Sequence, residues 1–222
     1  MDKTQIPTNY IKHTSKNPLQ RFLIERFFSS LVSLAKPLNP KKVLDAGCGE
    51  GFSLNKLIIN NVGEELEGIE NSKEAIILGK KLFPKAKVKL GSVYDLPYDS
   101  KNFDLVLCTE VLEHLENPQK ALSEIIRVSK KYIILSVPNE PFFRLANFLA
   151  GKYIKSFGNP PYHVNHWNLF SFQRFIKNQN AKIKVEELTK LEELTTTVEN
   201  NSEMKERIEK NEGIVGKLNE FE

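Results

Sequence analysis

Three glycines stand at alternate positions in the segment Asp45-Ala46-Gly47-Cys48-Gly49-Glu50-Gly51, behind a single acidic residue. Glycine permits backbone angles and close approaches that a Cβ atom would block. Apolar residues precede this segment and a helical pattern follows it, an arrangement that offers backbone N–H groups to a ligand at a helix N-terminus. The spacing differs from the Gly-x-Gly-x-x-Gly of dinucleotide-binding turns. We therefore predict a ligand site of another kind at this loop.

A second acidic residue, Glu70, ends the next apolar run of the chain. If that run is a strand beside the glycine loop, its final carboxylate is placed to accept hydrogen bonds from ribose hydroxyl groups. The pair of loops therefore predicts a ligand that contains a ribose.

Side chains suited to proton transfer follow a later apolar run, in Glu110-Val111-Leu112-Glu113-His114, and recur at His163 and His166. Imidazole exchanges a proton near neutral pH, so His114, His163 and His166 are the candidate catalytic residues. We predict no metal ion, although carboxylates and imidazoles could together hold a divalent ion that lowers the pKa of an acceptor. A capping and loop-ordering role for Glu113 and His114, and a packing role for the two later histidines, stay open as well.

Short apolar runs alternate with helical patterns from residue 41 onward. The strands and helices that this alternation predicts would hold the loops that carry the candidate site residues. The alternation predicts a doubly wound, mostly parallel, Rossmann-like α/β sheet with helices on both faces. One strand opens at Val43, and the others are expected at 66–70, 86–90, 103–108, 132–137 and 183–188. Helices are expected from Pro18 to before Pro37 and at 52–60, 73–83, 118–129 and 172–177.

These segments, in this order, resemble the motifs of the class I S-adenosylmethionine-dependent methyltransferases. Residues 43–51 resemble their first motif, 68–70 their ribose-binding motif, 91–98 their adenine-side loop and 103–115 their fourth motif. The resemblance covers residues 40–140 and implies S-adenosyl-L-methionine as the cofactor, which carries no pyrophosphate for Asp45 to repel. It implies cofactor contacts from Asp45, Ala46, Gly47, Cys48, Gly49, Glu70, Asn71, Ser92, Val93 and Thr109. Many members have Asp in place of Ser92, so either Ser92 contacts the adenine amino group or Asp95 takes part.

Two finer resemblances concern the methyl acceptor. Asn17-Pro18-Leu19-Gln20-Arg21 and residues 109–114 are similar to segments of the ubiquinone-biosynthesis O-methyltransferases, a branch of the methyltransferase type 11 domain. This similarity implies methyl transfer to oxygen of a small-molecule or lipid-like acceptor. Glu110-x-x-Glu113-His114 with a distant histidine also resembles small-RNA 3′-end 2′-O-methyltransferases, in which these side chains bind a divalent metal. An RNA methyltransferase and a non-catalytic cofactor-binding scaffold are therefore the alternatives.

The chain is expected to form an N-terminal helical cap (1–40), a methyltransferase domain (41–189) and a charged, helical C-terminal tail (190–222). Within the domain, residues 140–170 form a lid or acceptor insertion. Its aromatic and basic stretch from Phe142 to Phe157 favours either a lid helix packed over the sheet edge or an interfacial helix that admits a lipid-like acceptor. We expect at most peripheral membrane contact.

Charge and composition limit which partners and which cellular compartment are expected. Residues 1–185 carry a net charge of +10 and residues 186–222 one of −6. A basic body could attract nucleic acid or anionic lipid, but no compact basic or aromatic stacking motif favours nucleic acid. Cys48 and Cys108 offer no disulfide framework, and no apolar run approaches the ~20 residues of a membrane span. Without a signal-peptide pattern at its start, the chain is predicted to be cytoplasmic.

Overall fold

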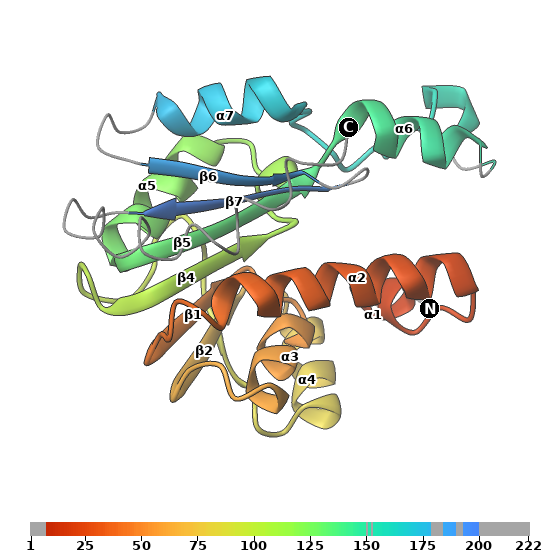
Figure 1. The fold of residues 1–222 in the computed structure, drawn as a ribbon. Helices are drawn as coiled ribbons and strands as arrows, with labels where there is room; N and C mark the ends of the chain where they lie inside the picture. Colours follow the sequence, from red (N-terminus) through yellow and green to blue (C-terminus); the bar gives the residue numbers. More distant parts are fainter. Residues whose placement is uncertain (1–7, 150, 152, 179–183, 190–192, 200–222) are drawn as a thin grey trace.

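The computed structural model describes residues 8–149, 151, 153–178, 184–189 and 193–199. Seven strands form one sheet in the order β3-β2-β1-β4-β5-β7-β6 (Figure 1). The first five are parallel, as the sequence predicts. They are β1 (Lys42–Ala46), β2 (Glu65–Glu70), β3 (Lys87–Leu90), β4 (Phe103–Thr109) and β5 (Ser129–Pro138).

The last two strands, β6 (Lys184–Thr189) and β7 (Glu193–Glu199), complete the sheet in the antiparallel sense. The prediction of a helical tail from residue 190 is wrong for β7. Its residues Leu194-Thr195-Thr196-Thr197-Val198 are mostly β-branched and favour a strand, and β7 pairs with both β5 and β6. The helical pattern predicted after residue 200 lies outside the described residues.

Helices cover both faces of the sheet: α2 (Pro18–Ala35), α3 (Phe52–Ile59), α4 (Lys73–Leu82), α5 (Pro118–Val128) and α7 (Leu169–Lys177). The predicted start of α2 is confirmed, because the Asn17 side chain accepts hydrogen bonds from Leu19 N and Gln20 N. α7 begins three residues before its predicted start. Asn168 and Ser171 form a reciprocal capping box there, which adds a turn to the helix.

Alternate residues of the central strands point to opposite faces of the sheet and belong to two apolar cores. Leu105, Leu107 and Ile134 pack with the buried side of α2 on one face of the sheet. Val106 and Ile133 pack with α5 and α7 on the other face. Burial on both faces explains why these strands are continuously apolar in sequence.

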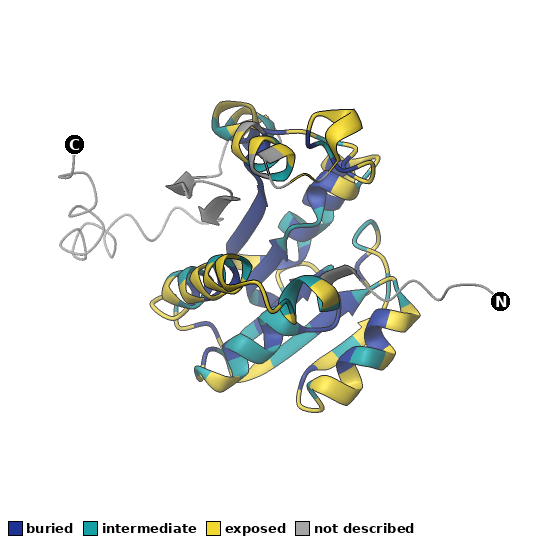
Figure 2. Cartoon of the chain, turned by 90° about the vertical axis from the view of Figure 1, so that its right-hand side faces the viewer, coloured by how far each residue is buried: buried dark blue, intermediate teal, exposed yellow. Residues whose placement is uncertain are grey.

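Three elements border the carboxyl ends of the strands, where the site is predicted (Figure 1). α1 (Thr8–His13), which was not predicted, packs against α2. α6 (Glu140–Leu149) and the 3-10 turn η2 (Ile154–Ser156) follow β5. Figure 2 colours the ribbon by burial: the residues of η2 are exposed, and α6 exposes the apolar side chains of Phe142, Leu145 and Phe148. Among the described residues, no helix is long and apolar enough to cross a membrane.

Candidate functional site

The glycine loop joins β1 to α3 beneath the carboxyl ends of the strands. Gly47, Gly49 and Gly51 have φ angles of 86°, 55° and 88°, in the left-handed region that glycine adopts without strain. A Cβ atom on Gly47 would lie 2.6 Å from Val111 Cγ2. Two constraints therefore require glycine at position 47: the positive φ angle of the turn and the close approach of Val111, which follows β4.

Glu70 ties the glycine loop to the loop after β2. Its Oε2 accepts a hydrogen bond from Gly49 N at 2.9 Å, and its Oε1 accepts from Asn71 N at 2.9 Å and Ser72 N at 2.8 Å. A carboxylate has about four acceptor positions, so acceptor capacity remains for a ligand hydroxyl group. Glu70 thus orders both loops in addition to its predicted role toward ribose.

Two carboxylates at the two ends of the loop, Asp45 and Glu50, are buried with oxygens that lack a hydrogen-bond partner among the described residues. Neither oxygen of Asp45 and only one oxygen of Glu50 has a hydrogen-bond partner among the described residues. Burial, and after it the charge of Glu70, raise the pKa of Asp45 to about 7. Burying an unpaired carboxylate is costly. This site therefore suits a ligand that brings hydrogen-bond donors or positive charge, and an α-amino group with a sulfonium supplies both.

α1 closes over the same loop, a contact that the sequence analysis missed. Tyr10 N donates to Glu50 Oε1 at 3.2 Å, and the His13 ring stacks on Phe52 with a centroid distance of 4.3 Å. Burial, followed by the charges of nearby lysines, lowers the pKa of His13 to about 4. A cavity of about 60 Å³ is left between α1, α2 and the loop, and Asp45 and Thr109 are among the residues that line it.

The predicted adenine-side residues lie in a tight turn after β3. Ser92 and Asp95 form an isolated bridge, and Ser92 Oγ accepts from Tyr94 N at 3.2 Å. Both side chains are exposed, while Val93 packs against the core. The turn leaves both Ser92 and Asp95 accessible, so the choice between them stays open.

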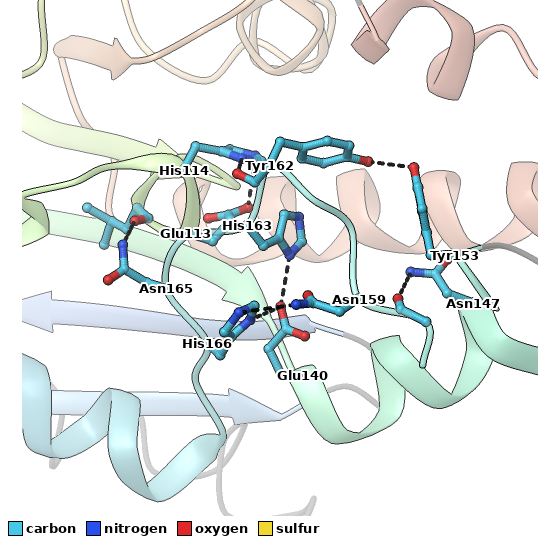
Figure 3. Close-up of polar contacts among 12 residues, drawn as sticks. Glu113, His114, Glu140, Asn147, Tyr153, Asn159, Tyr162, His163, Asn165 and His166 are labelled. Carbon is cyan, nitrogen blue, oxygen red and sulfur yellow. Dashed lines mark hydrogen bonds and ion pairs between the residues drawn. The ribbon is translucent and has the colours of Figure 1, made fainter. Parts of the chain in front are cut away.

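The predicted acid–base residues converge at the end of β4 (Figure 3). Glu113, His114 and His163, here called the Glu113 cluster, each offer one ligand atom within 4.8 Å of the others. Backbone N–H groups of Val164 and Asn165 donate to Glu113 O and hold the two segments together. Because the segments touch directly, an acceptor must approach beside them.

His163 and His166 flank Glu140, a residue to which the sequence analysis gave no role. Glu140 Oε1 lies 2.8 Å from His163 Nδ1 and 3.3 Å from His166 Nδ1. The far nitrogen of His166 lies 3.4 Å from the Asn159 amide, so His166 stands on the other side of Glu140 (Figure 3). Trp167 belongs to the core with Phe172. A lone acid directly after a strand's carboxyl end is the signal that could have identified Glu140.

Glu110 connects the Glu113 cluster to the glycine loop. It lines the 60 Å³ cavity and has a φ of 57°, a conformation that is strained for a residue with a side chain. Burial raises the pKa of Glu110, and burial together with the charge of Glu110 raises that of Glu113. A cofactor at the loop would therefore adjoin the acid–base residues.

Comparisons with known proteins indicate what kind of domain the chain contains. A family model described as a methyltransferase domain matches residues 44–135. A probable S-adenosylmethionine-dependent methyltransferase of Mycolicibacterium smegmatis is 28% identical over 46% of this chain, which spans only 40% of that protein.

Two solved structures share the fold. The plantazolicin methyltransferase BpumL, in complex with SAH and a desmethylPZN analog, superposes with a TM-score of 0.67 at 20% identity, over 88% of this chain and 90% of its own. The methyltransferase domain of bacterial CtHen1 gives 0.65 at 21% identity, over 81% of this chain and 100% of its own.

Proposed function

We propose that this chain, whose residues 44–135 match a methyltransferase domain, transfers a methyl group from S-adenosyl-L-methionine to a hydroxyl oxygen of a small-molecule or lipid-like acceptor. The observation that carries the proposal is that Glu110 lines the cavity at the glycine loop, three residues before Glu113 of the Glu113 cluster. An acid–base group next to a cofactor site is what methyl transfer to a hydroxyl group requires.

S-adenosyl-L-methionine, when bound, supplies an electrophilic methyl group on its sulfonium. Glu70 would accept hydrogen bonds from its ribose hydroxyls, the glycine loop would permit its close approach, and Asp45 would offer a carboxylate to its positive charge. His114 and His163 are each suited to remove the acceptor proton, because the Nδ1 of each ring is held by an acceptor within the protein, Tyr162 O for His114 and Glu140 Oε1 for His163.

Turnover of radiolabelled S-adenosylmethionine with lipid, small-molecule and RNA fractions tests the acceptor class. We expect the label in a lipid or small-molecule fraction. With that acceptor, His114→Ala or His163→Ala should lower kcat ~10²-fold or more at unchanged cofactor affinity. Glu116→Ala, an exposed neighbour of the cluster, is the matched control. Label in RNA, or normal turnover in all variants, would contradict the proposal.

A divalent metal at the Glu113 cluster is a second candidate, favoured by one observation. Glu113 Oε2 is buried and has no hydrogen-bond partner among the described residues. The cluster's carboxylate oxygen and imidazole nitrogens suit Mn²⁺, and a bound ion would lower the pKa of a hydroxyl acceptor. Mn²⁺ binding measured by electron paramagnetic resonance should then disappear in Glu113→Gln. Activity that survives a chelator would exclude this version.

A further inference from the structure

We propose that Glu140 is a positioning residue that holds His163 in the tautomer whose Nε2 atom serves the Glu113 cluster. The catalytic consequence rests on the methyltransferase function proposed above. The tautomer itself is a property of the protein alone and can be measured without cofactor or acceptor.

The contact between Glu140 and His163 defines which ring nitrogen carries the hydrogen. Glu140 Oε1 lies 2.8 Å from His163 Nδ1, and only 5% of Glu140 and 8% of His163 are exposed. A carboxylate accepts hydrogen bonds and does not donate them, so Nδ1 carries the hydrogen. In the neutral ring the lone pair is then on Nε2.

Two further contacts fix the orientation of this pair. Glu140 N donates to Trp167 O at 3.0 Å, which joins the start of α6 to the segment that carries His163. The Phe143 ring stacks on the His163 ring with a centroid distance of 5.4 Å and an interplanar angle of 15°. The imidazole is therefore held at one edge by Glu140 and on one face by α6.

The His114 ring is oriented through its Nδ1 atom in the same way, by a different acceptor. Its Nδ1 lies 3.0 Å from Tyr162 O, a carbonyl that only accepts, while its Nε2 lies 3.6 Å from Glu113 Oε1. In the neutral rings, two independent contacts thus place the lone pair on the same atom, Nε2, of two histidines of one cluster. Histidines that act as bases or ligands are oriented through their other nitrogen in this manner.

The test combines imidazole ¹⁵N spectra of the ligand-free protein with kinetics. In the wild type, His163 Nδ1 should have the shift of a protonated nitrogen and Nε2 that of a bare one. Glu140→Leu removes the acceptor, and the isosteric Glu140→Gln can turn its amide to donate. Both variants should shift His163 toward the opposite tautomer and lower kcat about 10–100-fold, with the KM for S-adenosylmethionine unchanged.

Glu116→Gln, an exposed acid near the cluster, is the control and should leave spectra and kcat unchanged. Near-UV circular dichroism of Trp167 verifies the fold of each variant. A wild-type His163 tautomer in either folded Glu140 variant would overturn the proposal, as would full kcat in a variant whose tautomer has changed. Absence of any methyl transfer by the wild type would instead refute the proposed function, while the spectra still decide the tautomer.

Discussion

Buried carboxylates without partners gather where the strands end. Asp45 lies at the end of β1, Glu113 follows β4, and Glu140 follows β5, and each has an oxygen with no hydrogen-bond partner among the described residues. Such groups cost stability. Their concentration at one edge is expected if binding and catalysis, rather than folding, require them there.

Asp45 should make the ligand-free protein less stable as pH rises. Its pKa is raised from 3.8 to about 7 in the folded chain, by burial and then by Glu70. The unfolded chain therefore releases this proton first, and stability falls between those two values. Urea unfolding across this pH range should show wild type losing stability relative to Asp45→Asn.

Asp104→Asn provides a control of opposite sign. Burial alone would raise the pKa of Asp104, but hydrogen bonds from Lys42 N and Lys41 N outweigh it, and the pKa is lowered. This contribution is present above the unfolded pKa and is lost as pH falls. If the free energy of unfolding of Asp45→Asn changed with pH in parallel with that of wild type, the raised pKa assigned to Asp45 would be contradicted.

Glu70→Ala should weaken binding of S-adenosylhomocysteine by ~1–3 kcal/mol, since hydrogen bonds to a charged acceptor are lost. It should also loosen the loop, because three backbone N–H groups lose their acceptor. Isothermal calorimetry measures the affinity, and Glu65→Ala, at the exposed start of the same strand, is the control. If Glu70→Ala binds S-adenosylhomocysteine with wild-type affinity, the predicted contact between Glu70 and the ribose is contradicted.

At the scale of elements, the position of α1 decides access to the glycine loop. The remaining cavity of about 60 Å³ is far below the ~300–1,000 Å³ of typical ligand pockets. We therefore expect α1 to shift when a cofactor binds, and its contacts through Tyr10 and His13 to set how readily it does so.

Phe52→Ala should accelerate cofactor dissociation about 2–10-fold. The variant removes the ring on which His13 stacks, and an aromatic pair is worth ~0.5–1.5 kcal/mol. Stopped-flow displacement of the bound cofactor measures the rate, with exposed Phe22→Ala on α2 as control. An unchanged rate would mean that α1 does not restrain the cofactor.

At the scale of the whole molecule, one sheet carries both cores and the site. The apolar clusters on its two faces share β4 and β5, whose carboxyl ends also lead into Glu110 and Glu140. Elements that share central strands are expected to unfold together.

S-adenosylhomocysteine should therefore stabilise the protein as one unit. At a free concentration 100 times its Kd, the free energy of unfolding should rise by ~2.7 kcal/mol. Trp167 fluorescence reports the α7 face and far-UV circular dichroism the whole chain, and the two transitions should move together. Separate transitions would show that the α7 face melts independently of the cofactor loop.

Local patterns in the sequence were sufficient for the parallel sheet and the cofactor loop. Continuous apolar runs predict strands buried on both faces, and the glycine spacing and Asn17-Pro18 act through the backbone of their own neighbours. The sequence also placed Glu113, His114 and His163 among the candidate site residues, but their meeting in one cluster is a finding of the structure.

Tertiary structure decided the features that depend on distant partners. β7 is a strand because the edges of β5 and β6 supply its hydrogen bonds, and α1 is ordered by contacts with Glu50 and Phe52. Glu140 gains its role only where α6 brings its carboxylate to His163, 23 residues away in sequence. Hydrophobic periodicity shows which face of a helix or strand is buried. A hydrogen bond between two separate segments leaves no such periodic pattern in either segment.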